Sequence, residues 1–149
     1  GDCMKSFKEY IIEGKVQKQQ SDPGEARSLF RQAEERLLDL NQLPLHENNA
    51  QFRFEDAYEV LREALQAFLA EKGYKSYSHE AIFSFAGEER FLNEAYARRA
   101  DRYREIRNDI NYRGKKVLIE EAREILSFVK RVLPELKKKF EEKMKSQEK

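Results

Sequence analysis

The stretch "FEDAYEVLREALQAFLAEKG", residues 54–73, decides the fold class. Its apolar side chains recur at spacings of three and four, so a helix places them on one face: Phe54, Ala57, Tyr58, Leu61, Leu65, Phe68 and Leu69. Gly73 follows the last of them, and glycine commonly ends a helix because it adopts the left-handed conformation without strain. The stretch therefore predicts one long amphipathic helix that stops before Gly73.

Three more amphipathic stretches predict long helices on either side of this one. The first begins in "SDPGEARSLF", where Asp22 is a suitable N-cap, and continues to residue 40. The second lies within residues 88–114 and ends at a glycine. The third has its apolar stripe over residues 118–140; Pro134 is expected to kink it, and its lysine-rich end is expected to fray. Four such helices joined by short connections bury their stripes most simply as a bundle.

Two shorter helices complete the expected architecture. One covers residues 79–87 behind a Ser78 cap, and the other ends at Gly14. No stretch alternates as a half-buried strand would, so no strand is predicted. We therefore expect an all-α fold, an up-and-down antiparallel four-helix bundle with additional short helices. The expected division is a short helical N-terminal segment at residues 1–20 and the bundle at residues 21–146.

The composition supports a helical domain and argues against several kinds of site. Charged residues make up 38% of the 149, while only 3 prolines and 6 glycines interrupt the chain, which favours long helices with solvated faces. Cys3 has no second cysteine, and His46 and His79 alone give no zinc-ligand cluster, so we expect no disulfide, metal or cofactor. Because no apolar run suits a signal peptide or a membrane span, we expect a cytoplasmic protein without a membrane partner.

The charge of the chain is nearly balanced overall, at +1, but it is not evenly distributed. Residues 98–116 carry eight basic side chains against three acidic ones, a local excess of five. Such a positive field suits a partner that carries phosphate. Exposed ion pairs with acids of the same helix, such as Asp101 and Glu105, would explain the run equally well, so charge alone does not decide its role.

The stretches "YKSYSHEAIFSFAGE" (residues 74–88) and "REIRNDINYRG" (residues 104–114) together resemble the HEPN superfamily, in particular its small stand-alone prokaryotic members. In those proteins a Ser-His-Glu helix start precedes a long helix that bears an Arg-Asn motif. The resemblance extends over residues 24–140, judged by the number and order of the helices. It implies the same helical bundle, with a site at the motif.

Many HEPN proteins are metal-independent endoribonucleases, often the toxins of toxin-antitoxin pairs, and share an arginine, a polar residue, a short spacer and a histidine. Matched residue by residue, the arginine is Arg107, the polar residue is Asn108 and the histidine position is Tyr112. A tyrosine, with an ordinary pKa of about 10, exchanges protons poorly near neutral pH. The replacement therefore favours binding over cleavage.

The resemblance implies a homodimeric module that binds RNA, a nucleotide or a partner protein, with a small nucleotidyltransferase as its partner in a toxin-antitoxin-like system. The alternative is a metal-independent endoribonuclease that uses Arg107 with Tyr112 or His79. In some members the partner transfers AMP to a tyrosine two places beyond the histidine. Gly114 holds that place here, so the neighbouring Tyr112 is the tyrosine to test for modification.

The motif end of the helix supplies a set of candidate ligand contacts. Arg107 and Asn111 are one turn apart, as are Asn108 and Tyr112, and a guanidinium beside amides can hold a phosphate or a carboxylate. The expected contacts are Arg104, Arg107, Asn108, Asn111, Arg113 and His79. The same side chains could instead tie down the turn at Gly114 or pair with acids of neighbouring helices.

The resemblance also implies how two copies would pair, with their motif helices facing each other across a two-fold axis. Tyr103, Ile110 and Tyr112 are expected to give this end of the helix an exposed, largely aromatic surface. The two copies of Arg107 and Asn108 would then line one shared basic cleft.

Overall fold

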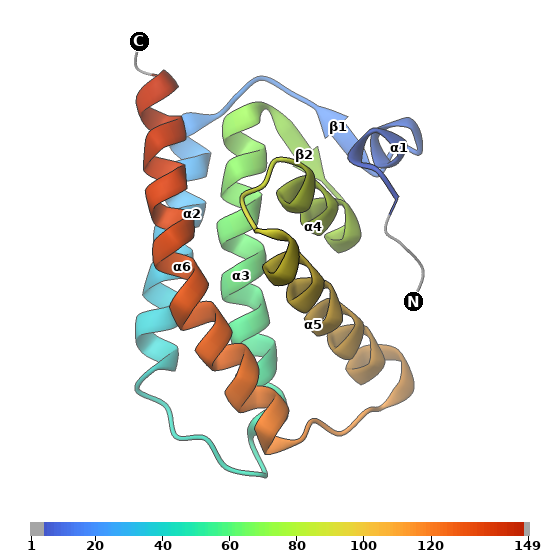
Figure 1. Cartoon of the computed structure of the whole chain (residues 1–149), viewed down its shortest axis with the longest axis vertical. Helices are drawn as coiled ribbons and strands as arrows, with labels where there is room; N and C mark the ends of the chain where they lie inside the picture. The colour runs from blue at the N-terminus through green and yellow to red at the C-terminus, as the bar shows by residue number, and fades with distance from the viewer. Residues whose placement is uncertain (1–4, 148–149) are drawn as a thin grey trace.

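A computed structural model of the chain describes residues 5–147, most of which are helical (Figure 1). The elements in chain order are α1 (Phe7–Ile12), β1 (Val16–Lys18), α2 (Pro23–Leu40), α3 (Ala50–Lys72), β2 (Tyr74–Ser76), α4 (His79–Glu88), α5 (Glu94–Arg113) and α6 (Ile119–Gln147). No helix in this part of the chain is both long enough and apolar enough to cross a membrane.

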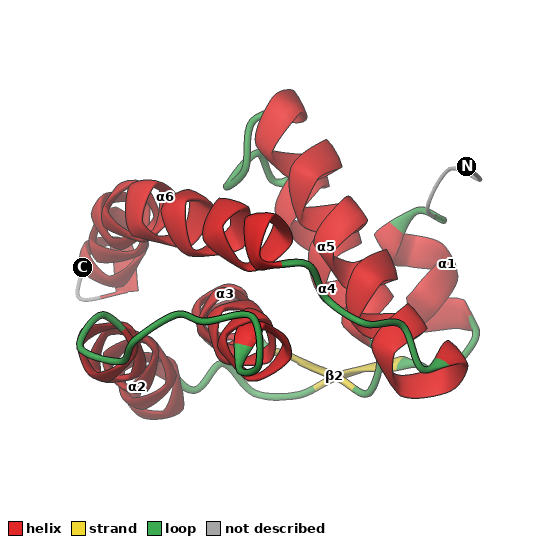
Figure 2. Ribbon diagram, turned by 90° about the horizontal axis from the view of Figure 1, so that it is seen from below, coloured by secondary structure: helices red, strands yellow, loops and turns green. Residues whose placement is uncertain are grey.

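The four long helices form an up-and-down antiparallel bundle. α2 and α5 run in one direction, and α3 and α6 run in the other (Figure 1). α3 lies at the centre and contacts α2, α6, α4 and α5, an arrangement that Figure 2 shows from one end. The expected all-α bundle is confirmed. Because α3 has neighbours on both sides, most of its circumference is apolar and buried.

The core of the bundle is largely aromatic. Phe68 of α3 stacks on Phe91, with 4.0 Å between ring centroids. Phe140 of α6 stacks on Phe30 of α2 at 4.8 Å and meets Phe68 edge-on at 5.4 Å. Leu61 and Leu65, on the apolar face expected for residues 54–73, are at most 1% exposed, as predicted. Ile106 of α5 and Ile125 and Val129 of α6 are at most 8% exposed, in agreement with the expected apolar faces of those helices.

α5 attaches to the rest of the bundle through Tyr103, which corrects one expectation. The Tyr103 ring packs on Phe128 of α6 at 5.4 Å and on Phe54 of α3 at 6.1 Å. Tyr103 is 2% exposed and Ile110 is 8% exposed, so neither contributes to a surface for a second copy. Both belong to the apolar stripe that faces the core. Of the three residues expected at such a surface, Tyr112 alone is exposed, at 84%.

The small antiparallel sheet is a second correction, because no strand was predicted. β1 and β2 pair with Val16 opposite Ser76 and Lys18 opposite Tyr74. The turn before β2 depends on Gly73, whose φ of 95° is left-handed and whose missing Cβ would lie 2.8 Å from the carbonyl oxygen of Gln19. Strands of three residues are too short to show an alternating pattern, and their pairing is set by tertiary structure.

α5 begins at Glu94, inside the stretch of residues 88–114 in which the helix was expected. Asn93 caps this helix by accepting a hydrogen bond from the N–H of Tyr96 at 2.8 Å, so the first helical residue is Glu94. Residues 89–93 form the turn that separates α4 from α5. An asparagine cap satisfies helix N–H groups that have no partner within the helix, which is why the helix begins there.

The end of α6 differs from the expectation. The helix continues past Pro134 to Gln147, so the fraying expected for its lysine-rich end is not found up to that residue, and residues 148–149 lie outside the described residues. The kink at Pro134 stays a prediction. Phe140 and Met144 are buried on the inner face of this segment. Burial of apolar side chains fixes a helix end that its lysine-rich composition alone would leave loose.

The N-terminal segment, expected at residues 1–20, contains α1 and β1 and is attached to α4. Phe7 packs on Phe85 with ring centroids 4.9 Å apart, and its backbone N–H donates to Glu88 at 2.7 Å. Ser84 donates its hydroxyl to the carbonyl oxygen of Lys5 at 2.8 Å. Cys3 lies outside the described residues. The segment therefore braces the helix that begins at His79.

Candidate functional site

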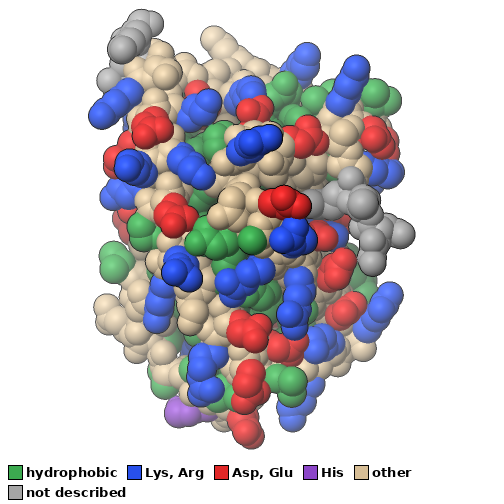
Figure 3. Space-filling view, viewed as in Figure 1, with side chains coloured by type: hydrophobic (Ala, Val, Ile, Leu, Met, Phe, Trp, Pro, Cys, Tyr) green, Lys and Arg blue, Asp and Glu red, His purple; other side chains and the backbone are tan. Residues whose placement is uncertain are grey.

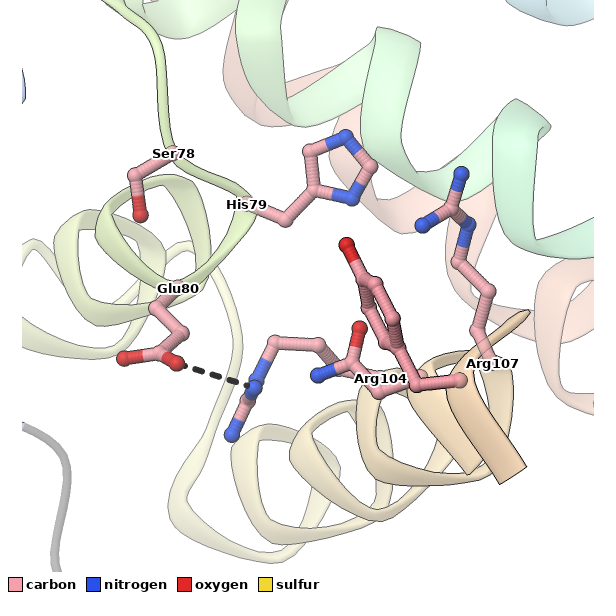
Figure 4. A pocket seen from close by; sticks show the side chains of 7 residues that line it. Ser78, His79, Glu80, Arg104 and Arg107 are labelled. Atoms are coloured by element: carbon pink, nitrogen blue, oxygen red, sulfur yellow. Dashed lines mark hydrogen bonds and ion pairs between the residues drawn. The ribbon is translucent and has the colours of Figure 1, made fainter. Parts of the chain in front are cut away.

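A concave site lies between the start of α4 and the C-terminal half of α5 (Figure 4). Its volume is about 370 Å³, and it is lined by Ser78, His79, Glu80, Arg104, Arg107, Asn108 and Tyr112. Ser78 caps α4 by accepting a hydrogen bond from the N–H of Ala81 at 3.3 Å, which makes His79 the first residue of the helix. Of the four residues from α5, Arg104, Asn108 and Tyr112 are spaced four apart, and Arg107 directly precedes Asn108, so they lie on one side of that helix.

The cavity brings together five of the residues that the sequence analysis selected: His79, Arg104, Arg107, Asn108 and Tyr112. His79 comes from a different helix than the other four. Asn111 and Arg113 do not line the cavity; both are exposed on other faces of α5. Arg113 instead pairs with Asp109 at 3.6 Å. The helical repeat thus divides one short motif between a concave site and the open surface.

The basic run of residues 98–116 is partly paired with acidic side chains. On the face of the molecule in Figure 3, lysine and arginine side chains are interspersed with aspartate and glutamate. Arg98 pairs with Glu94 at 2.9 Å, and Arg113 pairs with Asp109, in each case one turn along the helix. The interpretation as exposed ion pairs therefore holds for these two arginines. Among the described residues, Arg99, Arg102, Arg107 and Lys116 of the run have no ion-pair partner, and of these four Arg107 lines the cavity.

Arg104 connects α5 to α4, and the carboxylates of Asp101 and Glu80 compensate its charge. The residue is 8% exposed. Its Nε and Nη2 lie 2.9 and 2.8 Å from Oδ1 of Asp101, and its Nη1 lies 3.4 Å from Oε1 of Glu80. Figure 4 shows Glu80 and Arg104 meeting across one side of the cavity. With two carboxylates beside it, Arg104 mainly holds the two helices together.

Arg107 differs from Arg104 in its partners. Within residues 5–147 no carboxylate lies within ion-pair distance of its guanidinium, which is partly exposed to the cavity. The guanidinium carbon instead lies 5.4 Å from the centre of the Tyr58 ring. An arginine over an aromatic face is held by attraction to the ring electrons and keeps its N–H donors free for another group. Arg107 is thus the cation of the cavity whose charge no carboxylate of the described residues compensates.

His79 reaches toward Arg107 from α4 (Figure 4). Its Nδ1 lies 3.0 Å from the hydroxyl of Tyr58. Burial lowers the pKa of His79 to about 4, and the positive charges of Arg107 and Arg62 act in the same direction. The imidazole is therefore neutral near neutral pH. Its Nε2 has no hydrogen-bond partner among the described residues.

Tyr58 was placed on the apolar stripe of α3 by the sequence analysis, and its contacts with the site were not foreseen. The residue is 1% exposed, and burial raises the pKa of its hydroxyl, so the phenol keeps its proton. The signal that could have found it is its type, because a tyrosine in an apolar stripe carries one polar atom that needs a partner when buried.

Glu80 is a second member of the site that the sequence analysis did not select. Its Oε2 accepts a hydrogen bond at 2.9 Å from the hydroxyl of Tyr10, in α1. Burial and this hydrogen bond raise the pKa of Tyr10 to about 12, so it stays a donor. Glu80 thus faces Arg104 on one side and the N-terminal segment on the other. Within residues 5–147 no three histidine, cysteine, aspartate or glutamate side chains are grouped as metal ligands would be.

The cavity is therefore lined by several hydrogen-bond donors. The Asn108 amide, the His79 ring, the Ser78 hydroxyl and the guanidinium all line it. A group with several acceptor oxygens and a negative charge fits this set of donors.

Neither a family model, nor a curated protein, nor a solved structure matches this chain. The resemblance to the HEPN superfamily therefore rests on the two quoted stretches and stays a prediction.

Proposed function

We propose that the chain is a HEPN-type module that binds phosphate groups of RNA or of a nucleotide in this cavity without cleaving them. The observation that carries the proposal is Arg107, a cation in a concave site with no carboxylate partner among the described residues. Neutral donors from Asn108 and His79 lie beside it. Tyr112, 84% exposed at the edge of the cavity, provides a ring on which a base can stack.

The test is binding of a fluorescently labelled single-stranded RNA, followed by anisotropy at several salt concentrations. Arg107→Ala is expected to weaken binding about 10-fold or more, because a charge-assisted hydrogen bond contributes about 1.5–3 kcal/mol. Arg113→Ala is the matched control, since it removes the same charge from the same helix outside the cavity. Equal losses in the two variants would show that the basic run, and not the cavity, binds the RNA.

A second candidate function, metal-independent cleavage of RNA, is favoured by one observation. His79 shares the cavity with Arg107 and is neutral, so it has the residue type that the motif lacks at Tyr112. In this candidate Arg107 would stabilise the phosphate and His79 or Tyr112 would transfer protons. Incubation of the labelled RNA with the purified protein in a chelator separates the two: cleavage that disappears in both Arg107→Ala and His79→Gln would establish the nuclease.

We further propose a homodimer in which the α5 helices of two copies face each other, and a small nucleotidyltransferase as the partner in a toxin-antitoxin-like system. The support is the resemblance together with the exposure of Tyr112, the aromatic residue closest to the motif that the bundle leaves uncovered. Sedimentation velocity at micromolar concentration tests the dimer. If the wild type sediments as a monomer at that concentration, and Tyr112→Ser gives the same sedimentation coefficient, the two copies do not form a shared cleft.

A further inference from the structure

Tyr58 is the point at which three helices meet behind the cavity. It lies on α3, and it contacts His79 of α4 through a hydrogen bond of 3.0 Å. The two rings are also packed, with centroids 5.7 Å apart. Arg107 of α5 places its guanidinium over the same Tyr58 ring at 5.4 Å. One buried phenol therefore contacts both the arginine and the imidazole that line the site.

The hydrogen bond between Tyr58 and His79 can be made in two ways. In a neutral imidazole one nitrogen carries the proton and the other accepts. If the Tyr58 hydroxyl donates to Nδ1, the proton of His79 is on Nε2; if Nδ1 carries the proton and donates, the Tyr58 hydroxyl needs another acceptor. Among the described residues His79 is the sole hydrogen-bond partner of that hydroxyl. A buried hydroxyl without an acceptor costs about 1–3 kcal/mol, so the first arrangement is favoured.

Burial is the main reason that His79 does not take a second proton, and the charges around it act in the same direction. Arg107 and Arg104 face it from α5 and Arg62 faces it from α3, while Glu59 of α3 is the acid with the opposite influence. Three cations against one acid disfavour a charged imidazole. Below neutral pH the ring therefore stays a neutral group with one N–H, over a range in which an ordinary histidine becomes charged.

We propose that Tyr58 is a positioning residue that holds His79 as its Nε2–H tautomer and supports Arg107, so that both side chains act as hydrogen-bond donors to one oxyanion. This inference rests on the proposed phosphate-binding function and specifies which group the site binds and which side chains donate to it. The site recognises an ionised phosphodiester by its acceptor oxygens, and His79 is a ligand of the phosphate and not a proton acceptor. It also places the nuclease candidate second, because an Nε2 that carries a proton cannot serve as a base.

The tautomer is measured directly in the full chain by nitrogen-15 NMR of the histidine rings, whose two nitrogens give different patterns in the two tautomers. The chain has 2 histidines, and the signals of His79 are those absent from the His79→Gln variant. The wild type is expected to show the Nε2–H pattern at neutral pH. In Tyr58→Phe the pattern should shift toward a mixture of tautomers. An Nδ1–H pattern in the wild type overturns the inference, whether or not RNA binds.

The role in binding is measured with the same labelled single-stranded RNA. Tyr58→Phe is expected to weaken RNA binding about 3- to 10-fold, because the His79 ring loses the hydrogen bond that fixes its orientation as a donor. Tyr96→Phe is the matched control, because Tyr96 is partly buried against Phe128 and lies outside the cavity. Unchanged binding by Tyr58→Phe overturns the inference while the proposed function stands. Failure of the wild type to bind RNA removes the proposed function, and the NMR pattern then still decides the tautomer.

Discussion

The bundle core and the cavity are built by different kinds of contact, although α3 belongs to both. In the core, Phe68 of α3 packs among aromatic rings from three other segments, and shape and apolar area are all that the contacts require. At the cavity, Tyr58 of the same helix contacts one imidazole and one guanidinium. The core accordingly tolerates exchange between apolar side chains of similar size, whereas each polar contact at the cavity depends on one particular partner.

The largest expected effect is the loss of core packing in Phe68→Ala. The change removes a ring that stacks on Phe91 at 4.0 Å and leaves a cavity between α2, α3 and α6, so we expect the free energy of unfolding to fall by about 3–5 kcal/mol. Urea denaturation followed by circular dichroism measures it. Phe52→Ala is the control on the same helix, because Phe52 is 58% exposed. A comparable loss in both variants would contradict the assignment of Phe68 to the core.

The next effect concerns the turn that joins α3 to the small sheet. Gly73→Ala is expected to lower the free energy of unfolding by about 2–4 kcal/mol, since the left-handed conformation costs about 1–2 and the close contact with Gln19 adds to it.

Gly14→Ala is the matched control for Gly73→Ala. Gly14 has a φ of 79°, and a Cβ there would meet no atom within 4 Å, so this variant measures the backbone cost alone. Thermal unfolding of the two variants gives the difference between them. Equal losses would mean that the close approach of Gln19 to Gly73 adds nothing to the cost of the left-handed backbone.

The helices could be predicted from the sequence because their signals are local. The 3.6-residue repeat locates the buried face of α3, and the caps at Asp22 and Ser78 locate two helix starts. The β1–β2 pairing could not be predicted, because residues 16–18 and 74–76 are far apart in the sequence and carry no local signal for their pairing. The burial of Tyr103 was missed because the family resemblance suggested that it lies at an interface. The helical repeat alone would have placed it on the buried apolar stripe of α5.

The site was partly predictable for the same physical reasons. The spacing of Arg104, Asn108 and Tyr112 along one helix places them on one face, whereas Asn111 and Arg113 fall outside the cavity. The partners from other elements carry no local signal. Tyr58 is more than 45 residues before the motif in the chain and looks like one more core aromatic, as the printed sequence shows. Pairings between segments distant in sequence are decided by the fold and not by periodicity.

A smaller effect is the contribution of His79 to the pH dependence of the free energy of unfolding. Because the pKa of His79 is lowered to about 4 in the folded chain, the unfolded chain binds a proton first as pH falls below about 6.5. The stability that a neutral His79 contributes is fully present above about pH 6.5 and is lost as pH falls toward about 4. Between about pH 7 and pH 5 we expect a loss of about 1 kcal/mol, a value reduced for the partial exposure of the ring.

Comparing His79→Gln and His46→Gln with the wild type isolates the contribution of His79 to this pH dependence. His79→Gln cannot take up a proton, so its free energy of unfolding should fall less than that of the wild type over the same range of pH. His46→Gln is the control, because His46 lies in the exposed loop between α2 and α3. Urea denaturation at several pH values measures all three proteins. A His79→Gln profile parallel to the wild type would show that the His79 environment in the folded chain does not disfavour the charged ring.

The smallest effect tests whether the N-terminal segment belongs energetically to the cavity region. Tyr10→Phe removes the hydroxyl that donates to Glu80 at 2.9 Å but keeps the buried ring, so we expect a loss of about 0.5–1.5 kcal/mol at neutral pH. The wild type should lose this advantage as pH rises from about 10 toward 12, because the pKa of Tyr10 is raised to about 12 in the folded chain. Tyr77→Phe, at a residue 61% exposed, is the control. If Tyr10→Phe matches that control at every pH, Glu80 is positioned by Arg104 alone, and α1 covers α4 through the apolar contact of Phe7 without supporting the site.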